Sequence, residues 1–346
     1  MNVGKVALIL GITMIGLLGT MHYMNSEKIN NTSNSTLEIE DATPEIQERF
    51  QLFKEWMKEH KKVYGLGEAI SRFAIWNENY EKILEHNAKG LSWTLGLNQF
   101  SDLTLEEFSA MYLGYKHDPN APRNDVYLVE SGAKPQTFDW RTKGAVTPVG
   151  NQGQCGSCYT WSAGGALEGI YKIKKGELIE LSTSQQLDCT SSYGNQGCSG
   201  GLMEYCFKYT KEKGIMRASD YPYVAKVQTC KYNASKIVFK NTGYNNVPKN
   251  NPTQLKTAVQ QQPIAVAVQA SESAFQQYKS GIISSNCGTD LDHAIVLVGY
   301  GQDYWIVKNS WGTTWGEKGY AKIASGTQNN GAGVCGINSM ASYPTY

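Results

Sequence analysis

A stretch with two closely spaced cysteines, Asn151-Gln-Gly-Gln-Cys-Gly-Ser-Cys-Tyr159, constrains this chain more than any other feature. Cys155 and Cys158 bracket a Gly-Ser pair, and a helix-like run begins directly after Cys158. A cysteine at the N-terminus of a helix faces the positive end of the helix dipole, which favours thiolate over thiol. The same spacing occurs in redox and zinc sites. Because no second CxxC and no histidine pair follow, we expect a reactive nucleophile rather than a redox or metal centre.

The N-terminal segment predicts entry into the secretory pathway. Residues 1–20 contain Lys5 followed by an apolar run, as in a signal peptide, and that run is short for a membrane span. An uncleaved anchor is the alternative, and it is the one case in which we expect membrane contact. Either way the chain enters an oxidising compartment, which favours disulfides, and we expect delivery to a lysosome or vacuole or to the extracellular space. Sequons fit this route at Asn30, Asn31, Asn34 and Asn233, of which Asn233 is the predicted glycosylation site.

Length and charge narrow the choice of function. A chain of 346 residues has room for about two domains. Its net charge of +1 gives no argument for a nucleic acid or an anionic membrane surface as a partner. We therefore expect a globular protein that binds no nucleic acid.

Residues 21–44 are polar and predict a linker, and helical patterns follow from residue 45. Phe50, Phe53 and Trp56 repeat at helical spacing. Residues 96–102 alternate like a short strand, and Thr104 with Glu107 predicts a capping box at the start of a further helix. Between these segments, one face of a long predicted helix carries Glu68, Arg72, Trp76, Asn79, Ile83 and Asn87. Taken alone, this face indicates only an amphipathic helix.

The face of the long predicted helix resembles the ERFNIN motif of cathepsin L-like propeptides, with Trp76 where that motif has Phe. The stretch at residues 96–102 resembles their GNFD motif. The resemblance implies that residues 45–115 are a mostly helical inhibitory prodomain whose tail runs through the active cleft in the non-productive direction. Residues 116–133 contain prolines and Gly132, a composition typical of an exposed, cleavable connection. The mature domain is then expected to span residues 134–346.

The predicted secondary structure of the mature region changes from helices to strands near residue 245. Helices are predicted at 158–175, 181–187 and 201–214, with Gly176 as the stop of the first. Gly164-Gly165 within that helix predicts close approach by another backbone. Strands are predicted at 264–268, 294–298, 304–307 and 319–323. This order indicates an α+β protein with a helical half, a sheet-rich half and a ligand cleft between them.

The histidines narrow the choice of a catalytic base for Cys158. Four of the five, His22, His60, His86 and His117, precede the mature domain, which leaves His293. It opens an apolar strand, where a lone histidine is more often a satisfied core residue. Asn309 stands downstream, where another strand ends. The separations from Cys158 are 293 − 158 = 135 and 309 − 158 = 151 residues.

These residues resemble those of papain-like cysteine peptidases, in particular the cathepsin L-like branch, over residues 45–346. The resemblance implies a papain-like fold and a cysteine endopeptidase made as a zymogen, with no cofactor and no metal. It implies Cys158 as nucleophile, His293 as its ion-pair partner and general acid/base, and Asn309 as the group that orients the imidazole. Gln152 would bind the oxyanion and Trp311 would shield the histidine. Tyr159 and Thr160 depart from the usual Trp and Ala after the nucleophile, which affects the expected rate rather than the activity.

The cysteine pairing also follows only from the resemblance, because six cysteines allow fifteen pairings. It implies the disulfides Cys155–Cys198, Cys189–Cys230 and Cys287–Cys335. Cys206 remains, and we expect a buried, inert thiol on a helix. An intermolecular link or a second reactive site is the alternative.

Substrate binding is implied at two kinds of position. The loop before Met203 resembles one whose glycine backbone pairs with substrate in antiparallel fashion. An apolar second subsite, predicting hydrophobic or aromatic P2 residues, is implied at Met203, Ala267, Leu291, Ala294 and Met340, although these could be only core positions. The other implied substrate-binding residues are Gly156, Gly200, Gly201, Leu202, Asp292 and Trp311.

We therefore expect a monomeric protease whose partners are protein and peptide substrates and its own propeptide. A catalytically silent binding or storage homologue is the alternative, and the intact set of Gln152, Cys158, His293 and Asn309 argues against it. Activation is expected to be acid-triggered, because low pH protonates carboxylates that hold the prodomain in place, with Asp102 as one candidate.

Overall fold

The computed structural model describes residues 42–118, 121, 123–129, 132 and 134–346. They divide into two compact units, one ending at Asn77 and the other running from Glu78 to Tyr346. The predicted signal peptide, the linker up to residue 41 and the sequons at Asn30, Asn31 and Asn34 lie outside the described residues. Within the described residues, none of the helices combines the length and the apolar character that a membrane span requires.

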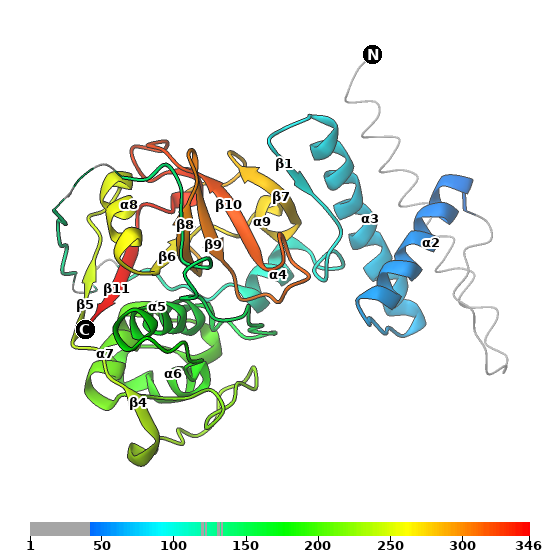
Figure 1. Cartoon of the computed structure of the whole chain (residues 1–346). Helices are drawn as coiled ribbons and strands as arrows, with labels where there is room; N and C mark the ends of the chain where they lie inside the picture. The colour runs from blue at the N-terminus through cyan, green and yellow to red at the C-terminus, as the bar shows by residue number, and fades with distance from the viewer. Residues whose placement is uncertain (1–41, 119–120, 122, 130–131, 133) are drawn as a thin grey trace. The chain divides into compact units, whose positions relative to one another are not determined.

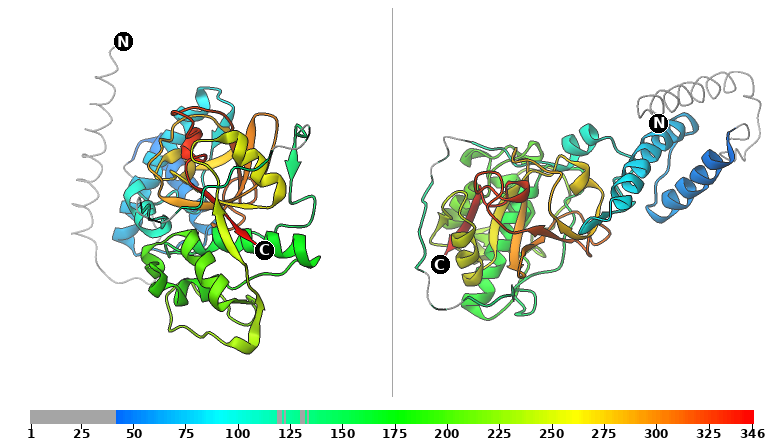
Figure 2. Two further views of the ribbon diagram at one scale, coloured as in Figure 1. Left: turned by 90° about the vertical axis from the view of Figure 1, so that its left-hand side faces the viewer. Right: turned by 90° about the horizontal axis from the view of Figure 1, so that it is seen from above.

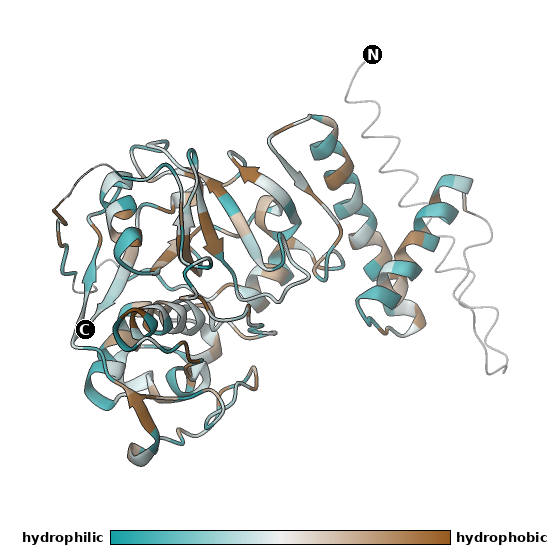
Figure 3. Ribbon diagram, viewed as in Figure 1, coloured by the Kyte–Doolittle hydropathy of each residue, from teal (hydrophilic) through white to brown (hydrophobic). Residues whose placement is uncertain are grey.

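The first unit is built from helix α2 (Pro44–Glu59) and the beginning of α3 (Leu66–Ala88). Thr43 caps α2, and Pro44 occupies its first position, where a missing N–H does no harm. Apolar and polar residues alternate along both helices (Figure 3). Trp76 is fully buried and packs 5.7 Å from the ring of Phe53, so the larger aromatic is accommodated at this position.

The second half of α3 uses its asparagines to hold the chain that follows. The side-chain amide of Asn79 donates to the carbonyls of Ser101 and Leu103, at 3.0 and 2.9 Å. Asn87 forms two hydrogen bonds of 3.0 Å with the backbone of Leu95. The predicted helix face therefore has a role beyond apolar packing, because its polar members replace missing backbone partners.

The predicted strand at 96–102 is wrong. The strand lies just before it, as β1 (Trp93–Leu95), and residues 99–102 form turns. The Asn98 side chain accepts from the N–H of Phe100 at 2.8 Å, and the Ser101 hydroxyl accepts from the N–H of Asn98 at 2.9 Å. Such local side-chain bonds compete with a strand ladder. The predicted capping box is confirmed at helix α4 (Leu105–Tyr112), where Thr104 and Glu107 bond reciprocally.

Three helices form the helical part of the second unit: α5 (Cys158–Lys175), α6 (Thr183–Cys189) and α7 (Met203–Lys213). They lie together in Figure 1 and in the left view of Figure 2, coloured green. Helix α5 contacts both α6 and α7 and strands β6, β8 and β11. Its C-terminal stop is Gly176, in a left-handed conformation as predicted. The neighbour of the glycine pair is not backbone: a Cβ on Gly165 would lie 2.7 Å from Cγ2 of Val296.

The sheet-rich part follows in sequence. Its main sheet runs in the order β1-β7-β10-β9-β8-β6-β11-β5, with β2 paired to β8, and β3 pairs with β4 separately. The four predicted strands are present, and β11 and β5 extend the sheet beyond them. The strands are β2 (Phe138–Asp139), β3 (Ile215–Met216), β4 (Ile237–Phe239), β5 (Gly243–Asn246), β6 (Ile264–Val268), β7 (Tyr278–Ile283), β8 (His293–Tyr300), β9 (Tyr304–Lys308), β10 (Tyr320–Ala324) and β11 (Ala341–Thr345), and the helices among them are α8 (Pro252–Gln261) and α9 (Ser273–Gln276).

Three disulfides are present, and they are the pairs that the resemblance implies: Cys155–Cys198, Cys189–Cys230 and Cys287–Cys335. Cys158 and Cys206 are free and buried. Cys206 lies on α7, where its sulfur contacts the amide of Asn195 at 3.5 Å, and burial raises its pKa well above the ordinary value. An inert thiol at this position is consistent with such burial.

Candidate active site

Cys158 is the first residue of α5, and the disulfide between Cys155 and Cys198 fixes the loop before it. Its thiol is fully buried in this structure. Burial raises the pKa of Cys158 to about 12, and hydrogen bonds from the backbone of Ala294 and Gly114 lower it in part. Cys158 is therefore held as a thiol, although it lies at a helix N-terminus.

His293 begins β8, where its backbone pairs with Val268 of β6. Its Nε2 is 2.9 Å from Oδ1 of Asn309, the residue that follows β9. Oδ1 also accepts from the N–H of Ser310 at 2.8 Å, which fixes the amide orientation. His293 Nδ1, on the other side of the ring, is buried and has no hydrogen-bond partner among the described residues. Burial lowers the pKa of His293 to about 4, so the imidazole is neutral here.

Trp311 stacks on the imidazole of His293, with ring centroids 4.5 Å apart and planes inclined by 26°. It is buried, so it keeps water from the bond between His293 and Asn309. Phe100 and Phe108 of the prodomain pack edge-on against the same indole at 5.5 and 5.2 Å. These two rings thereby hold the segment around α4 against the indole that stacks on His293.

Gln152 precedes Cys158 by six residues and is fully buried. Its Nε2 donates to the carbonyls of Cys155 and Tyr112, at 2.9 and 2.8 Å. Its Oε1 accepts from the Ser310 hydroxyl at 2.7 Å. One amide hydrogen of Gln152 is thus occupied by the prodomain carbonyl of Tyr112.

The prodomain tail crosses this site as an extended chain. The N–H of Gly201 donates to the carbonyl of Gly114 at 2.9 Å, and the N–H of Lys116 donates to Gly201 at 3.2 Å. The resulting bridge between Tyr115 and Gly201 is parallel, whereas a substrate is expected to pair in antiparallel fashion. Gly114 touches Gly156 so closely that a Cβ on Gly114 would overlap its carbonyl oxygen. The tail therefore covers Cys158 with its direction reversed.

The Tyr115 side chain occupies the predicted second subsite. It is buried in one cluster with Met203, Ala267, Ala294 and Met340, and Leu291 packs against that cluster from its edge. Its backbone N–H donates to the carbonyl of Asp292 at 2.9 Å, while the Asp292 carboxylate accepts from the N–H groups of two neighbouring residues, Ala270 and Ser271. The predicted subsite residues thus lie in, or packed against, the same buried cluster as the Tyr115 side chain.

Three residues near the site were not predicted. Asn195 accepts from the N–H of Leu202 at 2.8 Å and so shapes the loop that contains Gly200, whose φ is +112°. Ser310 links Gln152 to Asn309. Glu204 follows Met203 in α7 and is buried. The pKa of Tyr115 is raised mainly by its own burial and next by the nearby Glu204. No sequence signal marks Glu204, because a carboxylate in the first turn of a helix usually faces solvent.

Comparison with known proteins decides the family. Residues 134–345 match the papain family cysteine protease model, and residues 53–108 match the cathepsin propeptide inhibitor domain. The chain belongs to the papain family of cysteine proteases. It is 46% identical over 322 residues to the probable cysteine protease RD21C of Arabidopsis thaliana, covering 88% of this chain and 70% of the relative. It is 41% identical over 319 residues to procathepsin L of Rattus norvegicus, covering 88% and 94%.

Solved precursors have the same papain-like fold. Recombinant stem bromelain precursor superimposes with a TM-score of 0.80 at 43% identity, over 86% of this chain and 99% of that one. Digestive procathepsin L 3 of Tenebrio molitor gives 0.78 at 38% identity, over 86% and 99%. The protein is therefore a papain-family protease zymogen that contains its own inhibitory propeptide. Its three disulfides fit folding in the secretory pathway.

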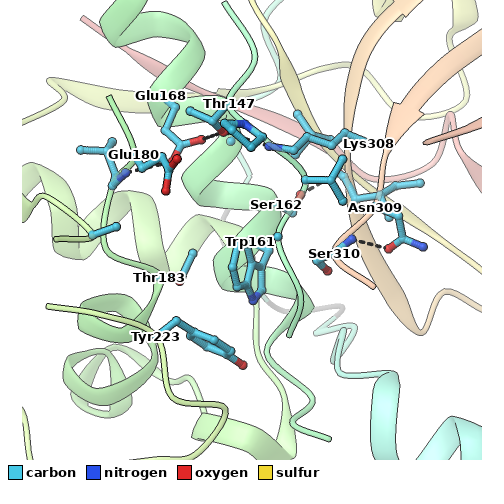
Figure 4. A pocket seen from close by; sticks show the side chains of 18 of the residues that line it. Thr147, Trp161, Ser162, Glu168, Glu180, Thr183, Tyr223, Lys308, Asn309 and Ser310 are labelled. Atoms are coloured by element: carbon cyan, nitrogen blue, oxygen red, sulfur yellow. Dashed lines mark hydrogen bonds between the residues drawn. The ribbon is translucent and has the colours of Figure 1, made fainter. Parts of the chain in front are cut away.

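A cavity of about 430 Å³ in this papain-family protease is lined in part by Asn309 and Ser310 (Figure 4). Glu168 and Lys308 line it, and both are buried. The Thr147 hydroxyl donates to the Glu168 carboxylate at 2.5 Å and accepts from Lys308 Nζ at 2.9 Å, so it joins the two charges. Because Asn309 follows Lys308 directly, this polar link helps to hold the end of β9 in place.

Proposed function

We propose that Cys158, His293, Asn309 and Gln152 catalyse peptide-bond hydrolysis once the prodomain tail has left. The observation that carries the proposal is the orientation of the imidazole: Nε2 is fixed to Asn309 at 2.9 Å, and Nδ1 is left unpartnered. Asn309 thereby selects the tautomer in which Nδ1 can accept the Cys158 proton. A backbone hydrogen bond from Ala294, the residue after His293, to the thiol supports this placement.

The reaction then follows acyl transfer to sulfur. The Cys158 thiolate attacks the scissile carbonyl carbon, and the carbonyl π electrons move to the oxygen. The Cys158 N–H and the Gln152 side-chain amide stabilise that oxyanion. As the C–N bond breaks, the His293 imidazolium protonates the leaving amine. Water, deprotonated by His293, attacks the thioester and releases the acid and the thiolate.

The prodomain tail is proposed to inhibit by occupying these positions in the wrong direction. Its Tyr112 carbonyl takes the Gln152 hydrogen that the oxyanion needs. Its Gly114 blocks Cys158, and its Tyr115 fills the second subsite. Part of the connection at residues 116–133 is hydrogen-bonded to the mature domain. The N–H of Val126 donates to the carbonyl of Asn246 at 3.0 Å, and the N–H of Asn246 donates to the carbonyl of Asn124 at 2.8 Å. Cleavage within residues 116–133 is therefore expected outside this paired stretch.

Hydrophobic or aromatic P2 residues are the proposed preference, and the seating of Tyr115 supports it. A library of fluorogenic dipeptides tests this preference, and Arg at P2 outrunning Leu and Phe would contradict it. We further propose a monomer that acts on protein and peptide substrates in a lysosome or vacuole, or outside the cell. Asn233 is exposed at the start of a short helix, which supports its glycosylation.

A peptidyl thiol-alkylating probe on acid-activated protein tests the catalytic assignment. We expect labelling at Cys158 and its loss in His293→Ala. The disulfide-bonded cysteines and buried Cys206 should remain unlabelled in both proteins, which is the internal control. Absence of labelling at Cys158, or equal labelling in His293→Ala, would refute the assignment.

A further inference from the structure

Tyr223 joins the two ends of the loop that contains the proposed oxyanion donors. Its phenol donates to the main-chain carbonyl of Gln152 at 2.7 Å. The same phenol oxygen is 2.6 Å from the hydroxyl of Ser157, which then acts as the donor. The loop begins at Gln152 and ends at Ser157, directly before Cys158. One side chain from a distant segment thus bridges the whole loop.

Aromatic packing fixes the phenol in this position. The ring of Tyr223 meets Trp161 of α5 edge-on, with centroids 5.0 Å apart and planes inclined by 72°. Both rings border the cavity that Asn309 and Ser310 also line (Figure 4). Burial raises the pKa of Tyr223, so the phenol keeps its proton and remains a donor to Gln152. The bridge is consequently present over the pH range in which the protease would work.

The bridge acts next to a turn in the loop. Gly153 has φ of +60°, a left-handed conformation that glycine adopts without strain, and its N–H donates to the Asn151 side chain at 2.9 Å. Ser310 holds Gln152 from the other side, through its carbonyl and its hydroxyl, at 2.8 and 2.7 Å. Without the phenol, the main-chain carbonyl of Gln152 would lose its donor, and Gln152 would keep its bonds to Ser310 and to the Cys155 carbonyl. The amide of Gln152 could then shift relative to the Cys158 N–H.

We propose that Tyr223 is a positioning residue for the oxyanion hole. It touches neither substrate nor reacting atoms but keeps Gln152 aligned with the Cys158 N–H, where both can bind the developing oxyanion. This inference rests on the proposed function, because it requires Gln152 to be an oxyanion donor. Losing a direct donor costs about 10²–10³ in rate, so a misaligned donor should cost about 10-fold.

The test is Tyr223→Phe in the activated enzyme, with Tyr221→Phe as the matched control. Tyr221 is two residues away and its phenol bonds Asp188 at 2.6 Å, with no contact to the loop. We expect kcat of Tyr223→Phe to fall about 10-fold with KM nearly unchanged, and inhibition by a peptide aldehyde, whose adduct bears the oxyanion, to weaken by the same factor. Alkylation of Cys158 by iodoacetamide, which forms no oxyanion, should be unchanged. Tyr221→Phe should keep kcat and aldehyde affinity while lowering thermal stability.

Two results would overturn the inference. One is a Tyr223→Phe enzyme with wild-type kcat and aldehyde affinity, and the other is an equal loss of iodoacetamide alkylation, which would place the effect on the thiolate. Failure of the wild-type enzyme to turn over substrate would instead refute the proposed function. If Tyr223→Phe does not fold, Ser157→Ala removes the other end of the bridge and should reproduce the same split. Unchanged aldehyde affinity in Ser157→Ala would then count against the proposal.

Discussion

Gly114→Ala should release the prodomain tail from the active site. A Cβ at this position would lie 2.7 Å from Cα of Gly156 and would overlap its carbonyl oxygen, so the tail must move away from the loop. The move breaks the hydrogen bonds of Gly114 and Lys116 with Gly201, at 2.9 and 3.2 Å, and that of Tyr115 with Asp292, at 2.9 Å. At about 1 kcal/mol net for each bond, the closed form loses about 3 kcal/mol. That corresponds to roughly a 100-fold larger open population.

The assay is the rate at which a peptidyl thiol-alkylating probe labels Cys158 in the intact zymogen at neutral pH. Because the thiol is fully buried in the closed form, labelling reports the open population. Gly67→Ala is the matched control, since a Cβ there meets nothing within 4 Å. We expect Gly114→Ala to be labelled roughly 100-fold faster than wild type and Gly67→Ala at the wild-type rate. A Gly114→Ala zymogen labelled as slowly as wild type would refute the steric argument.

Three further substitutions and one absorbance measurement test other parts of the structure. Glu204→Gln should reduce kcat/KM for P2 Tyr relative to P2 Phe about 10-fold in paired dipeptide assays, because it replaces the buried carboxyl that acts electrostatically on the Tyr115 phenol. Ultraviolet thiolate absorbance should be absent from the zymogen between pH 5 and 9 and appear after maturation, because the pKa of Cys158 is raised to about 12 in the closed form. Thr147→Val should destabilise the zymogen to denaturant by about 3 kcal/mol, since it removes one hydrogen bond from each of two buried groups, the Glu168 carboxyl and the Lys308 amine, whereas Thr142→Val at the surface should change little. Asp102→Asn should speed maturation at neutral pH, as followed by gel, and an unchanged rate would remove Asp102 as a candidate.

The fold could be predicted where local patterns agree with packing. Apolar runs such as that of β8 became central strands, and the capping box at Thr104 began a helix, because both patterns are recognisable in the local sequence. The strand expected at 96–102 failed because Asn98 and Ser101 hydrogen-bond to nearby backbone, which alternation does not reveal. The edge strands β1 and β5 were also missed, since short strands are defined by the partners they meet.

The candidate catalytic residues could be predicted from the sequence, whereas the neighbouring residues that position them could not. Counting histidines pointed to His293 because a nucleophile needs a base, and chemistry restricts that choice to few residue types. Ser310 and Tyr223 were not predicted, because serine and tyrosine are common and their roles arise only from where the fold places them. Glu204 escaped attention for the same reason: a carboxylate in a first helical turn usually faces solvent, whereas this one is buried.

The protonation of the closed site restricts where an acid trigger can lie. Burial keeps Cys158 as a thiol, with its pKa at about 12, and His293 neutral, with its pKa at about 4, so the pair holds one proton between these values. A thiolate–imidazolium pair in the open form also holds one proton. Because the pair neither gains nor loses a proton on opening, its titration does not make the opening equilibrium pH-dependent in the range where both forms hold one proton. Burial raises the pKa of Asp292, so Asp292 binds a proton more readily when closed, and acid would favour the closed form through it. An acid-triggered opening therefore requires another carboxylate, one whose pKa is lowered in the closed form, so that its stabilisation is lost as the pH falls.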